Sequence, residues 1–318
     1  MINSTPRQIQ EQIRKSDRIF LTAHKNPDGD ALGSLLAFFL YLQSLNKEVV
    51  VFLSDVPPCY FDFLPCFKNI TQDISVLSQR YDLAVVLDSS DLSRTRIDPS
   101  FFENKNIVNM DHHISNPGFG AFNFVDPKAS SSSEIVLRYL ENIGFTLDKK
   151  MATCLLTGIL DDTEGFTNGA TTNSAIGSAV DLIYTGARIN LIARKIANNK
   201  SFSALKIWGM ILSRLEINRE WGLAYTYIQE EELQDRQAEE GEIDGLVNFL
   251  NILTEVKAVA FFRIQKDGIR GSLRTTRDDV DVSLLAGIFN GGGHKKAAGF
   301  MAPKMEIRDI LEKIGPKV

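Results

Sequence analysis

Three short apolar runs, each followed at once by an imidazole or a carboxylate, constrain the fold of this chain most. The runs are Arg18–Ala23, Leu83–Leu87 and Ile107–Met110, and the residues directly after them are His24, Asp88 and Asp111. Continuous apolar runs of this length are typical of strands in a parallel sheet that is covered on both faces. Because functional side chains gather at the carboxyl ends of such strands, these three residues are expected at one edge of the sheet.

Helical patterns lie between the predicted strands and complete βαβ units. A Val-rich strand is predicted at Glu48–Leu53, and helices at Ala31–Leu45, Ser132–Asn142, Lys150–Leu160 and Asn173–Tyr184. We therefore expect an α/β fold whose first domain, residues 1–187, is a parallel sheet with helices on both faces. A helical connector, 188–217, is predicted to lead to a smaller α/β domain at 218–318, where strands at Val256–Gln265 and Gly268–Thr275 flank a turn.

The length of 318 residues fits two domains. The longest apolar run, Leu35–Leu42, is shorter than the ~20 residues that cross a bilayer, and the amino terminus lacks the apolar segment of a secretory signal. Three cysteines cannot all pair with one another, which favours reduced thiols. We therefore expect a cytoplasmic protein with no membrane partner.

Charge is distributed unevenly along the chain. The net charge is −5, yet residues 257–318 carry 12 basic and 7 acidic side chains, so that this segment is positive and the remainder strongly negative. An acidic protein is a poor general binder of long nucleic acid, which needs a broad basic surface. The split indicates an acidic metal-binding domain and a basic domain that binds the phosphates of a substrate. Chance scatter of charge is the alternative.

The four histidines of the chain stand beside acidic residues or glycines. His24, Asp28 and Asp30 share one tight loop, and Asp28 and Asp30 point to opposite sides of an extended segment, so that they can bind two different ions. The candidate metal ligands are His24, Asp28, Asp30, Asp88, His112 and Asp162. Mixed imidazole and carboxylate ligation without thiolate suits Mn²⁺ or Mg²⁺, with Co²⁺ as a substitute. Two such ions ~3.5–4 Å apart activate a bridging water for in-line displacement at phosphorus.

Each of these features also has a purely structural interpretation. Asp88 could cap a helix, and so could the serines at 130–133. The glycines at 291–293 could be a flexible joint, and a His-His pair is often a surface feature. Their joint occurrence, each at the end of a predicted strand or helix, favours a metal-dependent enzyme that acts on a phosphorylated substrate.

The same residues resemble a known family. His24-Lys-Asn-Pro-Asp28-Gly-Asp30-Ala-Leu-Gly-Ser, then Asp88, Asp111-His112-His113 and Asp162-Thr163, resemble the four motifs of the DHH phosphoesterase superfamily. Ser272-Leu-Arg274 and Gly291-Gly-Gly-His294 resemble its DHHA1 domain. The length is similar to that of the RecJ-like branch of nanoRNases and pAp phosphatases. One departure is Glu164, an extra negative charge where the family usually has Gly after Asp-Thr.

The resemblance implies a role for each motif residue. His24, Asp28 and Asp88 would bind one Mn²⁺; Asp30, Asp88, His112 and Asp162 would bind a second, so that Asp88 bridges the two ions. His113 would face the scissile phosphate as a hydrogen-bond donor or proton source. The expected substrate-binding residues are Ser131, Arg274, Gly292, Gly293 and His294.

The implied activity is hydrolysis of very short single-stranded RNA or DNA to mononucleotides, and of 3′-phosphoadenosine 5′-phosphate to AMP. The resemblance also allows a homodimer. Within the same class of enzyme, the alternative is a phosphodiesterase for a cyclic dinucleotide or for its linear product. A different class of protein, a metal-dependent nucleotide sensor without turnover, is a further alternative, although a complete set of six ligands argues against it.

Overall fold

A computed structural model describes residues 4–197, 200–234, 240–243 and 245–318. The chain forms two compact units, Met1–Asn199 and Lys200–Val318. Helix α6 (Ile189–Ala197) belongs to the first unit and α7 (Phe202–Leu212) to the second, so the stretch predicted as a connector is divided between them. Among the described residues, no helix has the length and apolar character needed to traverse a lipid bilayer.

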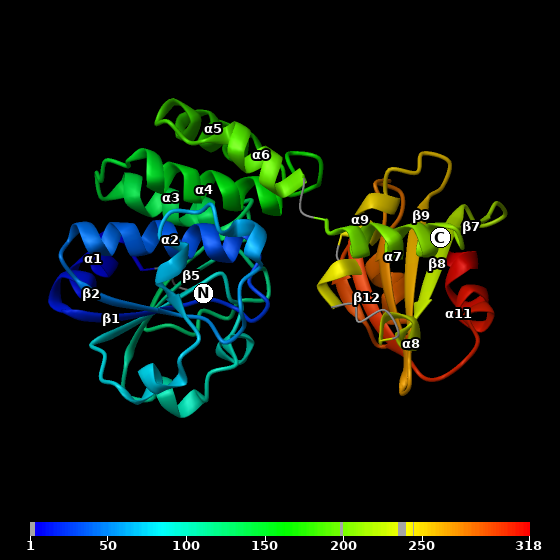
Figure 1. Cartoon of the computed structure of the whole chain (residues 1–318), viewed down its shortest axis with the longest axis horizontal. Coiled ribbons are helices and arrows are strands. Elements are labelled where there is room, and N and C mark those ends of the chain that lie inside the picture. Colours follow the sequence, from blue (N-terminus) through cyan, green and yellow to red (C-terminus); the bar gives the residue numbers. More distant parts are fainter. Residues whose placement is uncertain (1–3, 198–199, 235–239, 244) are drawn as a thin grey trace. The chain divides into compact units, whose positions relative to one another are not determined.

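The first unit is built on a six-stranded parallel sheet in the order β3-β2-β1-β4-β5-β6 (Figure 1). Its strands are β1 (Arg18–Thr22), β2 (Glu48–Phe52), β3 (Ile70–Thr71), β4 (Leu83–Leu87), β5 (Asn106–Asp111) and β6 (Phe122–Val125). The chain runs from β1 to β2 and β3 on one side and returns to β4 on the other side of β1. Strand order therefore reverses between β1 and β4, and such switch points open a crevice at the carboxyl edge of a sheet.

Helices cover both faces of this sheet, as predicted, but the helices differ in kind between the two faces. The α-helices all lie on one side (Figure 1): α1 (Pro6–Lys15), α2 (Gly29–Ser44), α3 (Ser132–Asn142), α4 (Lys149–Asp162), α5 (Asn173–Tyr184) and α6. On the opposite face, the 3-10 helices at Ile74–Ser78, Leu92–Thr95 and Pro99–Phe102 cover a second core rich in aromatic residues, including Phe20 and Phe101. Large aromatic rings fill space on this face that short turns leave open.

Helix α4 packs on α2 and α3, in a second layer. Two glycines allow α4 to approach α2 and α3 closely. A Cβ on Gly33 of α2 would lie 2.5 Å from the carbonyl oxygen of Cys154, and a Cβ on Gly158 of α4 would lie 2.0 Å from Oγ of Ser133. Helix α2 is apolar around most of its circumference because α4 buries the side that faces away from the sheet.

The second unit contains a mixed sheet in the order β11-β12-β10-β9-β8-β7, in which only β8 and β9 pair in parallel. Its strands are β7 (Glu216–Asn218), β8 (Leu223–Gln229), β9 (Ala258–Gln265), β10 (Gly268–Arg274), β11 (Gly292–His294) and β12 (Ala297–Ala302). Its remaining helices are α8 (Glu230–Gln234), α9 (Leu246–Leu250), α10 (Val282–Gly287) and α11 (Ile307–Ile314). Apolar residues of α7 to α9 cover one face, and those of α10 and α11 the other. The fold class is α/β, as predicted.

Candidate metal centre

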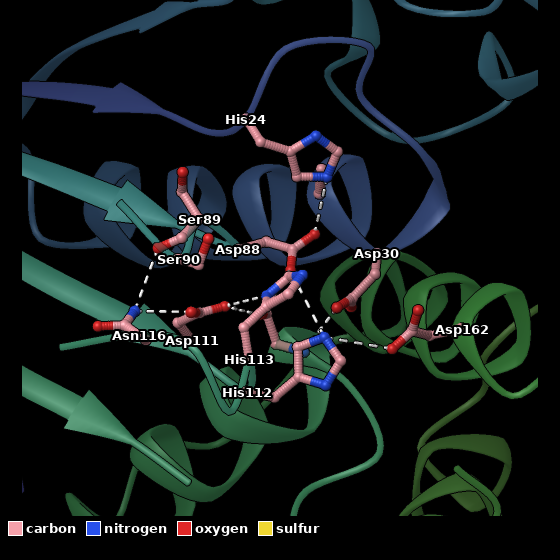
Figure 2. A network of polar contacts seen from close by, with 12 residues as sticks. His24, Asp30, Asp88, Ser89, Ser90, Asp111, His112, His113, Asn116 and Asp162 are labelled. Atoms are coloured by element: carbon pink, nitrogen blue, oxygen red, sulfur yellow. Dashed lines mark hydrogen bonds and ion pairs between the residues drawn. The ribbon is translucent and has the colours of Figure 1, made fainter. Parts of the chain in front are cut away.

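The predicted ligands of the first unit converge at the carboxyl edge of its sheet (Figure 2). His24 follows β1, Asp88 directly follows β4, and Asp111 ends β5. Because β1, β4 and β5 are neighbours, the parallel register brings these three residues together. This is the position of the switch in strand order, where functional groups are expected from the sequence.

Asp88 occupies the centre of the cluster (Figure 2) and adopts a left-handed backbone conformation, with φ of 52°. Such a conformation is uncommon for a residue with a Cβ and is found at sites where the surroundings fix it. The amide of Asp88 donates a hydrogen bond of 3.0 Å to the carbonyl oxygen of Met110 on β5. Its carboxylate is nearly fully buried, with Oδ2 3.2 Å from Nε2 of His24 and Oδ1 3.7 Å from Nε2 of His112.

Among the described residues, the possible ligand atoms form three overlapping groups in this region. They are His24, Asp28 and Asp88; Asp30, His112 and Asp162; and Asp88, His112 and His113. Nε2 of His24 lies 3.7 Å from Oδ2 of Asp28, and Nε2 of His112 lies 3.3 Å from Oδ2 of Asp162. A divalent cation with ligands at ~2.1 Å has neighbouring ligand atoms about 3.0–3.4 Å apart. The observed separations are close to that value, so the residues fit a pair of cations.

Asp28 is the N-cap of α2, with an extended backbone, and Asp30 lies in the first turn of that helix, so the prediction of an extended segment is wrong for Asp30. Oδ1 of Asp28 caps this helix by accepting hydrogen bonds from the amides of Asp30 and Ala31, at 3.1 and 3.0 Å, and Oδ2 faces His24. The amide of Gly29 donates to Oδ2 of Asp161, at 2.8 Å. The Asp28 carboxylate therefore fixes the start of the helix with one oxygen and offers the other as a ligand.

Asp30 is held by the amino terminus of α3. Its two carboxylate oxygens accept hydrogen bonds from the amides of Ser132 and Ser133, at 2.6 and 2.8 Å. The hydroxyl of Ser132 donates to Oδ1 of Asp88, at 3.0 Å. The positive end of a helix dipole favours such an anion. Ser132 and Ser133 are site residues whose sequence pattern indicated only possible helix caps.

Negative charge is in excess in this cluster. Burial and the neighbouring carboxylates raise the pKa values of Asp30 and Asp162 well above the usual range for aspartate. Burial, followed by the charge of Asp28, raises the pKa of Asp161 to about 7. Carboxylates in such surroundings need a compensating cation.

The pKa values of His24 and His112 are shifted in opposite directions. Burial by itself lowers the pKa of His24, but hydrogen bonds and charges from Asp28 and Asp88 outweigh it and raise the pKa to about 11. Nδ1 of His24 lies 2.6 Å from the carbonyl oxygen of Lys25, so that Nε2 faces the carboxylates and can serve as a ligand once a cation displaces its proton. Burial lowers the pKa of His112, which favours the neutral form that binds metals.

His113 lies beside the cluster with its Nδ1 bonded to another group. Nδ1 is 2.7 Å from Oδ1 of Asp111, and the side-chain amide of Asn116 donates to Oδ2 of Asp111 at 2.6 Å. Nε2 of His113 is 3.1 Å from Nη1 of Arg94. Asp111 belongs to the Asp-His-His motif, whereas neither Asn116 nor Arg94 stands in a pattern that could be recognised in the sequence.

The chain after Asp162, where the sequence departs from the family pattern, has an unusual backbone. Glu164, Gly165 and Phe166 all have positive φ, at 50°, 68° and 69°. The side-chain amide of Asn168 donates to the carbonyl oxygen of Asp162 at 2.8 Å. The departure therefore coincides with a left-handed turn that ends α4.

The residues predicted to bind substrate are placed differently from one another. Ser131 is fully buried and caps α3, with its Oγ accepting a hydrogen bond of 3.1 Å from the amide of Glu134; its neighbour Ser132 is the serine that contacts the cluster. Arg274 and His294 lie in the second unit. Each pairs with Ala297 in the sheet register, so they lie on the same face of that sheet.

The glycine segment of the second unit, for which a flexible joint is one interpretation of the sequence, is part of the sheet. Residues Gly292 to His294 form the short strand β11, and a Cβ on Gly293 would lie 2.5 Å from the carbonyl oxygen of Ala297. Arg274 is half-buried, and its Nε donates a hydrogen bond of 2.8 Å to the side chain of Asn248 on α9. Asn248 is a further residue without a sequence signal.

Comparison with known proteins agrees with this geometry. The chain is 29% identical over 297 residues to the bifunctional oligoribonuclease and PAP phosphatase NrnA of Thermus thermophilus, covering 93% of this chain and 87% of that one. The solved structure of an exopolyphosphatase-related protein from Bacteroides fragilis matches with a TM-score of 0.88 and 26% identity, over 98% of this chain and 95% of that one. RecJ of Thermus thermophilus, solved with Mn²⁺, shares the fold at a TM-score of 0.58 and 12% identity, over 98% of this chain and 53% of that one.

Family models match both units. The model of the DHH family, N-terminal domain, matches residues 18–159, and the model of the DHHA1 domain matches residues 222–316. The first match contains His24, Asp88 and His112, and the second contains Arg274 and His294. The chain is therefore a hydrolase of the DHH phosphoesterase family with a DHHA1 domain.

Proposed function

We propose that this protein is a manganese-dependent phosphoesterase with two cations, which hydrolyses very short oligonucleotides to mononucleotides and 3′-phosphoadenosine 5′-phosphate to AMP. The observation that carries the proposal is the position of Asp88. Its two carboxylate oxygens face different imidazoles, Oδ2 toward His24 and Oδ1 toward His112, as a ligand shared by two cations requires. A single shared carboxylate at the centre of six ligands is the arrangement expected for phosphoryl transfer.

The proposal assigns each residue of the cluster a role in binding metal, in positioning a ligand or in proton transfer. His24, Asp28 and Asp88 hold one cation; Asp30, His112 and Asp162, together with Asp88, hold the other. Bound divalent cations would neutralise charge on the phosphoryl oxygens and acidify a water molecule. Ser132, Ser133 and the α3 terminus keep the Asp30 carboxylate in place. His113, oriented by Asp111, faces the phosphate and exchanges a proton or a hydrogen bond with it.

Manganese is proposed because the donor set consists only of imidazole nitrogen and carboxylate oxygen. Such sites favour Mn²⁺ or Mg²⁺ over ions that prefer thiolate, and Co²⁺ can substitute. Because four aspartates converge with two imidazoles, two divalent cations come close to balancing the charge of the ligands. The raised pKa values of Asp30 and Asp162 support the need for that positive charge.

Short substrates are proposed from charge and from the second unit. With a net charge of −5, the chain offers no extended basic track for a polynucleotide. Arg274 can instead bind one phosphate with two parallel hydrogen bonds, and Asn248 holds its guanidinium. His294, on the same sheet face, would contact a terminal phosphate or a base edge. The similarity to a protein named an oligoribonuclease and PAP phosphatase supports the same substrate class.

A panel of substrates tests the proposal. Purified protein with Mn²⁺ is incubated with a dinucleotide, 3′-phosphoadenosine 5′-phosphate, a cyclic dinucleotide and pyrophosphate, and the products are separated by chromatography. Hydrolysis of the first two substrates, and its loss in excess chelator, is the expected result. Preference for the cyclic dinucleotide would favour the alternative phosphodiesterase, and binding without hydrolysis of any substrate would favour a nucleotide sensor.

A further inference from the structure

Arg94 is a half-buried arginine beside the metal-binding cluster, and it belongs to none of the motifs. It lies in the 3-10 helix Leu92–Thr95. Its Nη1 is 3.1 Å from Nε2 of His113 and 3.5 Å from Oγ of Ser90. Its guanidinium is therefore positioned directly beside the proposed catalytic histidine.

The backbone of Arg94 also contributes to the site. Its carbonyl oxygen accepts a hydrogen bond of 2.6 Å from the amide of Lys25, the residue after His24. This bond joins the loop after β4 to the loop after β1, the two loops that supply Asp88 and His24. The backbone of Arg94 is therefore held next to the loop that carries His24.

The surroundings of this guanidinium are unusual for a half-buried arginine. Arg138 and Arg214 each donate to carboxylates, those of Asp126 and Glu232 among them. Arg94, in contrast, forms no ion pair with a carboxylate in the part of the chain that the structure describes, and its two side-chain hydrogen bonds there both use Nη1. Hydrogen bonds from Ser93, and to a lesser extent the charge of Arg94, lower the pKa of the nearby Asp91. A guanidinium has five N–H donors in a plane that matches phosphate. The remaining donors of Arg94 are suited to an anion.

The contact with His113 shows which group donates at this point. A guanidinium can only donate, so Arg94 supplies the hydrogen at this contact. A phosphate oxygen accepts hydrogen bonds in the same way, and it can replace Nε2 of His113 as the partner of Nη1.

We propose that Arg94 is a catalytic residue that donates hydrogen bonds to a non-bridging oxygen of the phosphate at which hydrolysis occurs. An anion at this position takes the Nη1 hydrogen bond from Nε2 of His113, which frees that nitrogen. Charge on the phosphoryl oxygens is what fixed cationic donors stabilise most in phosphoryl transfer. The proposal rests on the proposed function, because it assumes that phosphate binds at this cluster.

Phosphate affinity tests the proposal without relying on turnover. Dissociation constants of inorganic phosphate and of AMP are measured by calorimetry on the Mn²⁺-loaded protein, with bound manganese determined for each variant. Arg94→Ala should weaken both ligands about 10–100-fold, the loss expected for charge-assisted hydrogen bonds. The dissociation constants of Arg94→Lys should lie between those of the wild type and Arg94→Ala, because lysine keeps the charge and lacks the planar guanidinium. Arg80→Ala, which removes an exposed arginine of the same unit, should leave both constants unchanged.

A double-mutant cycle with His113 separates binding from mere positioning. If Arg94 touches phosphate, Arg94→Ala weakens phosphate binding further in a His113→Ala background. If Arg94 acts only by orienting His113, the second substitution has no effect there, and the proposal is overturned. Arg94→Gln, which keeps the side-chain length, replaces Arg94→Ala if circular dichroism shows that the alanine variant is unfolded.

The outcomes also distinguish this proposal from the function on which it rests. In one outcome, the wild type hydrolyses no member of the substrate panel, but the Arg94→Ala protein binds phosphate more weakly than the wild type does. The proposed function is then wrong, and the role of Arg94 in phosphate binding stands. Unchanged phosphate affinity in an otherwise active Arg94→Ala protein overturns the role of Arg94 alone. A wild type that binds neither phosphate nor AMP overturns it as well.

Discussion

Gly158 in α4 and Asp30 in α2 lie so close together that a Cβ on Gly158 would be 2.6 Å from Oδ1 of Asp30. The same Cβ would lie 2.0 Å from Oγ of Ser133, whose amide donates to that carboxylate. The carboxylate therefore lies against the backbone of α4, at the point where α4 contacts α2. Any side chain at position 158 must displace the Asp30 carboxylate or the start of α3.

Gly158→Ala is therefore expected to impair metal binding as well as stability. The added methyl group should cost about 1–3 kcal/mol of unfolding free energy, as overpacking in a rigid core does, and bound Mn²⁺ should fall by about one ion per chain. Gly177→Ala is the matched control, since Gly177 lies in α5 with open space around it, and alanine favours a helix. Urea unfolding and metal analysis are the measurements; full Mn²⁺ occupancy in Gly158→Ala would contradict the expected link between this glycine and the metal site.

Asp88→Asn tests the shared carboxylate with little disturbance of the fold. Asn tolerates the left-handed backbone of this position, which has φ of 52°, so the substitution removes the charge and keeps the conformation. Turnover of every substrate should fall more than several hundredfold, because one well-placed electrostatic group is typically worth ~10²–10³ in rate. Turnover is measured by steady-state kinetics in saturating Mn²⁺, and circular dichroism is the control for folding. An active Asp88→Asn enzyme would rule out a bridging role.

The adjacent histidines should behave differently when each is replaced by alanine. His112 faces Asp88 and Asp162, so His112→Ala should lower the number of manganese ions bound per chain. Nδ1 of His113 is bonded to Asp111, so His113→Ala should keep the metals and lose turnover. Metal content by atomic emission and kcat on a dinucleotide are measured in parallel. Equal loss of metal in the two variants would mean that the roles are assigned wrongly.

Arg274→Ala tests the contribution of the second unit to binding. The guanidinium is held by Asn248 and can bind one phosphate, so its loss should raise KM for dinucleotides about 10–100-fold, the worth of a charged hydrogen bond. Hydrolysis of a small chromogenic phosphodiester, which offers no second phosphate, should hardly change. An unaltered dinucleotide KM would remove Arg274 from the substrate site.

Much of the first unit could be predicted because its signals are local. An imidazole or a carboxylate stands at or just after the end of each of the apolar strands β1, β4 and β5, and the ligands His24, Asp88 and His112 lie together as a result. The elements that pack on the second face of the sheet could not be predicted from the sequence in the same way. One face is packed by short 3-10 turns and aromatic residues such as Phe101, which have no helical periodicity.

The residues that support the ligands carry little signal in the sequence. Ser132 and Ser133 bind Asp30 through backbone amides, which any residue could supply, and Arg94 reaches His113 only through the fold. Ser131 precedes these two serines, is buried and caps α3, and its predicted contact with substrate stays a prediction. Which serine of such a run faces the site depends on the helical phase at its start, and the sequence does not determine that phase.

Length dependence of hydrolysis is the measurement that tests the central claim most directly. Specificity constants are determined in Mn²⁺ for single-stranded oligonucleotides of two, ten and thirty residues, with Asp88→Asn as the control for contaminating nuclease. We predict that kcat/KM falls steeply between the dinucleotide and the ten-residue strand, because an acidic chain of net charge −5 is a poor binder of long strands, whereas the proposed site holds one or two phosphates. Equal specificity constants for the two-residue and thirty-residue strands would contradict this claim.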